Sequence, residues 1–146
     1  EPVNGTSFNY NFSYNSTTDV GVNITSPQSE MAYMFYVNLG NPGYYTSAGV
    51  LSGCYVNSSN ACLDNTAPFS NLQPSVYWSA PEYAPDPSYA WYFSTSYGNQ
   101  TIGDKTLVNY AWAVSPGDVA AVPEAQTYAL MLAGLGLIGW RARRRG

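Results

Sequence analysis

The last third of the chain contains three stretches in which large aromatic or aliphatic residues alternate with smaller ones. They are "VYWSA" at 76–80, "YAWYFSTS" at 89–96 and "LVNYAWAV" at 107–114. Alternation with a period of two is typical of strands that bury one face. The proline-rich "PEYAPDP" and the turn-forming "YGNQTIGDK" separate them. This pattern predicts an antiparallel meander of three strands, with four buried residues in the last strand: Val108, Tyr110, Trp112 and Val114.

A helix is predicted at about 27–39, ahead of the meander. Ser26-Pro27 fits an N-cap followed by proline at the first helical position, and Gly40 suits the C-terminal cap. Between them, apolar residues recur at helical spacing: Met31, Met34, Phe35 and Leu39. Residues 3–25 are rich in Asn, Ser, Thr and Tyr and are expected to form an irregular hairpin or a long loop. The middle of the chain, through residue 74, is expected to consist mainly of loops.

The charges are few and unevenly placed. Charged residues make up only 10% of the chain, all four arginines lie within 141–145, and Lys105 is the other basic residue. Residues 1–140 therefore carry nine acidic side chains and one basic side chain. Without a basic patch, the body is not expected to bind nucleic acid.

The absence of histidine excludes several kinds of catalytic and metal site. It removes the usual general base, the Ser-His-Asp and Cys-His arrangements, and most zinc or copper sites. The two cysteines, Cys54 and Cys62, stand at the ends of a short loop rich in Asn and Ser. We interpret them as a local disulfide formed in an oxidising compartment, the alternative being two unpaired thiols. The chain is expected to be no enzyme and to hold no metal or cofactor.

The C-terminal segment consists of an apolar run followed directly by arginines. Tyr128 to Trp140 is 13 residues long and contains no charged side chain. As a helix it would cover about 20 Å, whereas the hydrocarbon layer of a membrane is about 30 Å thick. Arginines after the run would stay on the cytoplasmic side, which places the acidic body on the exported side. A plain membrane anchor is one interpretation. An amphipathic surface helix does not fit a run that is apolar on all sides.

The ending "VPEAQTYALMLAGLGLIGWRARRRG" resembles the PEP-CTERM sorting signal of Gram-negative bacteria. Ala125 departs from the second proline that is usual there. The residues that match the signal are Val122, Pro123, Glu124, Arg141, Arg143, Arg144 and Arg145. The resemblance implies export, transient insertion of the helix in the inner membrane, and recognition by an exosortase, which is a membrane cysteine transpeptidase. Cleavage near Pro123-Glu124 would then deliver the body to the cell surface or the exopolysaccharide matrix.

The body resembles the Lcl C-terminal domain family, named after a collagen-like bacterial adhesin. The family pattern reads Tyr-Trp-Ser-Ser-x-Glu-Tyr, then Ala-Trp-x-Phe, a glycine turn and a last strand. Ala80-Pro81 and Ser115 depart from it. The residues that match are Tyr77, Trp78, Ser79, Glu82, Tyr83, Ala90, Trp91 and Phe93. The resemblance covers roughly residues 26–118.

This resemblance implies an α+β, C-type-lectin-like fold with antiparallel strands, one helix and long loops. The apolar run adds a C-terminal hydrophobic helix. It divides the chain into an Lcl C-terminal-like domain at 1–118, expected to lack its N-terminal part, and a sorting or anchor segment at 119–146. Trp78, Trp91 and Trp112 are interpreted mainly as core residues.

The candidate glycan site is the proline-rich loop, which offers carboxylates and aromatic rings to a sugar: Glu82, Tyr83, Asp86 and Tyr89. Because the body holds one lysine, a neutral glycan is expected rather than an anionic one. The sequence thus favours an exported surface or matrix protein, with glycan binding as its candidate activity. The alternative is a structural component of the matrix or of a surface filament that binds no ligand.

Overall fold

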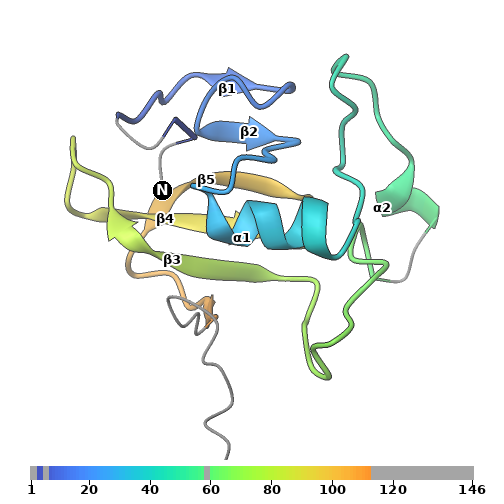
Figure 1. Cartoon of the computed structure of the whole chain (residues 1–146). Coiled ribbons are helices and arrows are strands. Elements are labelled where there is room, and N and C mark those ends of the chain that lie inside the picture. The colour runs from blue at the N-terminus through green and yellow to red at the C-terminus, as the bar shows by residue number, and fades with distance from the viewer. Residues whose placement is uncertain (1–2, 5–6, 58–59, 113–146) are drawn as a thin grey trace, which may run out of the picture. The chain divides into compact units, whose positions relative to one another are not determined.

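The computed structural model describes residues 3–4, 7–57 and 60–112, and Glu1–Trp112 form one compact unit. A single six-stranded sheet organises this unit, with the order β1-β2-β5-β4-β3-β6. The strands are β1 (Phe12–Ser13), β2 (Val20–Val22), β3 (Val76–Glu82), β4 (Tyr89–Ser94), β5 (Asn99–Asp104) and β6 (Tyr110–Ala111). The helices are α1 (Glu30–Tyr33), the π-helix η1 (Met34–Asn38) and α2 (Cys54–Asn57). The described unit is therefore a sheet-rich α+β arrangement, in which α1 lies over the sheet (Figure 1).

The centre of the sheet is an antiparallel meander, but its third strand is not the predicted one. β3 pairs with β4, and β4 pairs with β5 from Tyr89↔Asp104 to Ser94↔Asn99. The predicted turn "YGNQTIGDK" thus contains β5. This segment becomes a strand because it is paired on both sides, with β4 and with β2.

The prediction for 107–114 is wrong. The short strand β6 instead pairs in parallel with β3 at the edge of the sheet. Val108 is 100% exposed and Tyr110 is 52% exposed, because this segment has left the meander and only two of its residues rejoin the sheet. Trp112 is half-buried, and Val114 lies outside the described residues.

The N-terminal segment also differs from the expected hairpin. β1 and β2 pair in parallel, with Phe12 opposite Val20. A hairpin requires antiparallel strands, so that alternative is wrong, although the segment is as irregular as predicted. Asp19 holds it in place, because its buried carboxylate accepts hydrogen bonds from the backbone N–H groups of Val3 and Asn9.

The predicted helix exists but begins three residues late. Ser26 starts a turn instead, since the N–H of Ser29 donates to the Ser26 carbonyl at 3.0 Å and helical residues begin only at Glu30. The second half is a π-helix, closed by a hydrogen bond from Leu39 N–H to Met34 O at 2.9 Å. Gly40 follows with a φ of +68°.

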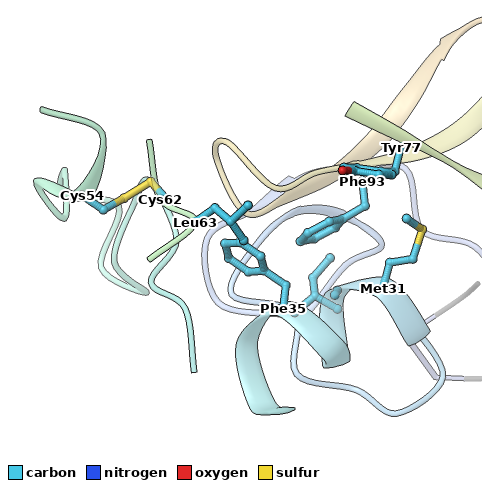
Figure 2. Packing of buried hydrophobic residues seen from close by; sticks show 9 residues of the cluster. Met31, Phe35, Cys54, Cys62, Leu63, Tyr77 and Phe93 are labelled. Atoms are coloured by element: carbon cyan, nitrogen blue, oxygen red, sulfur yellow. A yellow bond between two sulfur atoms is a disulfide. The ribbon is translucent and has the colours of Figure 1, made fainter. Parts of the chain in front are cut away.

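The core lies between this helix and one face of the sheet. Phe35 packs on Phe93 of β4 with 5.3 Å between ring centroids, and Tyr77 of β3 stands opposite Phe93 in the register. Figure 2 shows Met31 and Leu63 beside these rings and the Cys54–Cys62 disulfide at one end of the cluster. That disulfide joins Cα atoms 4.9 Å apart. It links two residues of the middle of the chain, and both belong to the core cluster.

The three tryptophans of the body have different environments. Trp91 is fully buried, as predicted. Trp112 is half-buried and packs against the core cluster. Trp78 is half-buried and pairs in the register with Tyr92, whose side chain points away from the face that carries Trp91 and Phe93. The sheet therefore has a second aromatic face, opposite the core.

Candidate functional site

The proline-rich loop between β3 and β4 brings the four predicted glycan residues into one region. Its backbone is closed by hydrogen bonds between Tyr83 N–H and Tyr89 O at 3.0 Å and between Asp86 N–H and Tyr83 O at 3.1 Å. The Glu82 carboxylate forms an ion pair with Lys105. The Asp86 carboxylate accepts the N–H of Ser88 at 2.9 Å. Both acidic side chains therefore take part in the structure of the loop itself.

The aromatic members of this loop also have protein partners. The Tyr83 ring packs edge-on against the Tyr10 ring, with 4.7 Å between ring centroids, and its centroid lies 6.4 Å from that of the Trp91 ring. Phe8 stacks on Trp91 at 4.8 Å, which completes an aromatic cluster between the N-terminal segment and the loop. Tyr89 is half-buried at the start of β4. Sugar binding by this loop stays a prediction. The aromatic rings in this region are largely engaged in packing against one another.

A pocket of about 340 Å³ opens on the sheet face opposite the core. Its walls come from β1, β2, β3, β4, β5, the 44–45 segment and the β4–β5 turn. Five of its nine lining residues are aromatic. The full lining consists of Phe12, Val22, Tyr44, Tyr45, Val76, Tyr92, Ser94, Tyr97 and Asn99.

The strand register explains why these side chains meet. Ser94 of β4 stands opposite Val76 of β3 on one side and Asn99 of β5 on the other. Val22 of β2 pairs with Asn99 and extends the same face. Because side chains alternate across a sheet, Tyr92 shares this face with Ser94. Neighbouring strands thus place Ser94 beside Asn99, in a pocket whose other lining residues are mostly aromatic.

Ser94 is the unusual residue of the pocket. It is 2% exposed, and its Oγ has no hydrogen-bond partner in the part of the chain that the structure describes. Buried hydroxyl groups are nearly always paired, because leaving one unpaired costs about 1–3 kcal/mol. An unpaired hydroxyl in a pocket wall is therefore a candidate ligand contact.

Tyr92 is held firmly at the pocket wall. Its ring lies against Gly103 of β5, where an added Cβ would come within 2.9 Å of the ring, and it meets Trp78 at 6.1 Å between centroids. Burial raises the pKa of the Tyr92 hydroxyl, so that group stays protonated at neutral pH. None of the nine described lining residues carries a charge.

Sequence reasoning did not find this pocket. Its residues span Phe12 to Asn99, so no local motif contains them. One usable signal was present in β4, where Tyr92 and Ser94 alternate with the buried Trp91 and Phe93. A large aromatic residue on the outer face of a strand indicates that this face also makes contacts.

Within 3–4, 7–57 and 60–112, no group of three or more His, Cys, Asp or Glu side chains gathers to hold a metal ion. No helix in those ranges has the length and apolar character needed to cross a membrane. The predicted hydrophobic helix and the sorting residues lie outside the described residues.

Comparisons with known proteins identify the C-terminal segment. No curated protein and no solved structure matches the chain. The Lcl resemblance and the C-type-lectin-like fold therefore stay predictions. Residues 121–145 match the family model described as the PEP-CTERM protein-sorting motif. The chain thus carries a sorting motif that marks an exported protein, one that passes through the membrane and is processed there by an exosortase.

Proposed function

We propose that the chain is a non-enzymatic protein of the cell surface or the exopolysaccharide matrix, delivered there after an exosortase removes its tail. The observation that carries this proposal is the match of residues 121–145 to the sorting motif. The motif ends in arginines that stop transfer through the membrane and begins with Val122-Pro123-Glu124, where cleavage would release the body. The disulfide of the body agrees with a destination outside the cell, because disulfides form and persist in oxidising compartments.

The sorting proposal predicts a specific mass. Protein isolated from the surface of the native host is expected to lack Tyr128–Gly146, because cleavage takes place near Pro123-Glu124. Intact-mass measurement of the surface fraction, compared with the chain made in a host without an exosortase, tests this. Finding Arg143–Gly146 still attached to the surface-located protein would mean that the tail is an ordinary membrane anchor.

We further propose that the exported body binds glycan. The half-buried Tyr83 and Tyr89 of the proline-rich loop, and the aromatic side chains that line the pocket on the outer sheet face, support this proposal, because aromatic rings stack on the C–H faces of sugars. The body, residues 1–118, carries eight acidic residues and one lysine, which favours neutral glycans over anionic ones.

The alternative is a structural component of the matrix or of a surface filament. Exposed apolar side chains favour it, since they suit contacts with neighbouring chains: Val50, Leu51, Val56, Leu107 and Val108. A glycan array probed with the full-length protein separates the two candidates. Binding to neutral glycans is expected; a blank array together with concentration-dependent assembly would favour the structural alternative.

A further inference from the structure

We infer that the pocket on the outer sheet face binds a neutral pyranose sugar. This inference rests on the proposed glycan binding by the exported body, and it names both the ligand class and the place. It moves the site from the proline-rich loop to a pocket lined by nine residues from the strands and their neighbouring segments. Three features of the pocket carry it: an unpaired buried hydroxyl, a set of aromatic walls and the lack of charge.

The unpaired hydroxyl indicates a ligand with hydrogen-bonding groups. Ser94 Oγ is buried without a partner in the described part of the chain, while the neighbouring Asn99 contributes an amide to the same pocket. A hydroxyl can both donate and accept, and an amide offers two donors and an acceptor. A sugar hydroxyl placed here would pair with Ser94 Oγ and remove the penalty of leaving it unpaired. An apolar side chain from a second copy of the protein would leave that penalty in place.

The aromatic walls suit the apolar faces of a sugar ring. Four tyrosines and Phe12 line the pocket, and the volume of about 340 Å³ lies at the lower end of the range for small-molecule sites. The face of an aromatic ring is electron-rich, so it attracts the slightly positive C–H groups of a pyranose. Gly103 and Trp78 fix the Tyr92 ring before any ligand arrives. A preformed wall lowers the entropic cost of binding.

The lack of charge selects a neutral ligand. A buried carboxylate or sulfate needs a cationic partner or several donors, and none of the lining residues is basic. The Tyr92 hydroxyl, whose pKa is raised by burial, remains a neutral group that neither repels nor pairs with charge. The pocket therefore favours hexoses over uronic acids and sulfated sugars.

Titration calorimetry on the full chain under non-reducing conditions tests the inference. The protein is kept in a zwitterionic detergent, because a detergent with a sugar headgroup would compete for the pocket. Maltose, cellobiose and lactose serve as neutral probes, and glucuronic acid serves as the charged probe. The wild-type chain is expected to bind at least one neutral disaccharide and to bind glucuronic acid at least tenfold more weakly.

Two serine variants form a matched pair. Ser94→Ala is expected to weaken binding about fivefold, the usual loss for one hydrogen bond, without lowering the melting temperature, because Ser94 Oγ has no protein partner to lose. Ser79→Ala removes the hydrogen bond that Ser79 Oγ donates to Trp91 O at 3.0 Å, outside the pocket. It is expected to lower the melting temperature by a few degrees and to leave sugar affinity unchanged.

Three outcomes would overturn the inference, and they can be told apart. If neutral sugars bind equally to wild type and Ser94→Ala but not to Asp86→Asn, glycan binding stands and its site is the proline-rich loop. If glucuronic acid binds as well as the disaccharides, the ligand class is wrong. If none of the probes binds, the inference fails and glycan binding loses its support, while the sorting proposal, tested by mass, is unaffected.

Discussion

Replacing Arg143, Arg144 and Arg145 with glutamine is expected to leave the exported protein unprocessed, with its C-terminal segment attached. Carrying an arginine to the centre of a bilayer costs about 3 kcal/mol on insertion scales, so consecutive arginines form a strong barrier to transfer. Without that barrier the apolar run can pass through the membrane, and the Val122-Pro123-Glu124 segment is no longer held where the exosortase acts. Intact mass of the protein from the native host, in cell-associated and released fractions, is the measurement.

Lysine replacements at the same three positions provide the control. They keep the positive charge and are expected to leave processing close to that of wild type, because stop-transfer depends on charge rather than on the guanidinium group. Normal processing of the glutamine variant would contradict the charge argument. Failure of the lysine variant would instead mean that the exosortase system recognises the arginine side chains themselves.

The second large effect is expected at Gly98, in the turn between β4 and β5. Gly98→Ala should lower the free energy of unfolding by about 2–5 kcal/mol, combining the left-handed backbone penalty with overpacking. Gly98 has a φ of +68°, and an added Cβ would lie 2.8 Å from Cε1 of the buried Phe35 ring and 2.5 Å from Tyr36 Oη. That oxygen cannot move away easily, because the Tyr36 hydroxyl donates to the Gly98 carbonyl. Burial raises the pKa of Tyr36, which keeps this donor protonated.

Gly40→Ala separates the two contributions. Gly40 also has a φ of +68°, but nothing lies within 4 Å of an added Cβ there. Only the backbone penalty of about 1–2 kcal/mol is therefore expected. Urea unfolding of both variants under non-reducing conditions gives the comparison. Equal losses would show that the packing of Phe35 and Tyr36 against the turn contributes nothing measurable.

The strands that sequence reasoning found are those whose pattern is local. β3 and β4 have aromatic residues at alternate positions, and both exist near their predicted places. β5 was missed because its sequence, "NQTIGD", consists largely of residues that are also typical of turns. What makes it a strand is non-local: it pairs with β4 and β2, and Gln100 donates from its side chain to Asp19 O at 2.9 Å across 81 positions of the chain.

The alternation at 107–114 was misleading for the opposite reason. Its residues have strong strand propensity, but the neighbouring position in the meander is already occupied by β5, so only Tyr110 and Ala111 find a partner, on the far side of β3. The pocket was likewise out of reach. Its key group, Ser94, is distinguished by the lack of a hydrogen bond, and no sequence pattern reports that.

The position of β6 has a mechanical consequence for the chain before cleavage, while its tail is still inserted in the membrane. Tension along the chain from the C-terminal side enters the described unit at Trp112, directly after a two-residue edge strand. Because the strand is so short, few backbone hydrogen bonds share the pulling force. The load therefore falls on the Trp112 ring. Its centroid lies 5.1 Å from that of the Phe69 ring and 5.6 Å from that of the Tyr77 ring. Pulling β6 away would uncover the edge of β3 and leave its backbone open to a strand from a neighbouring chain.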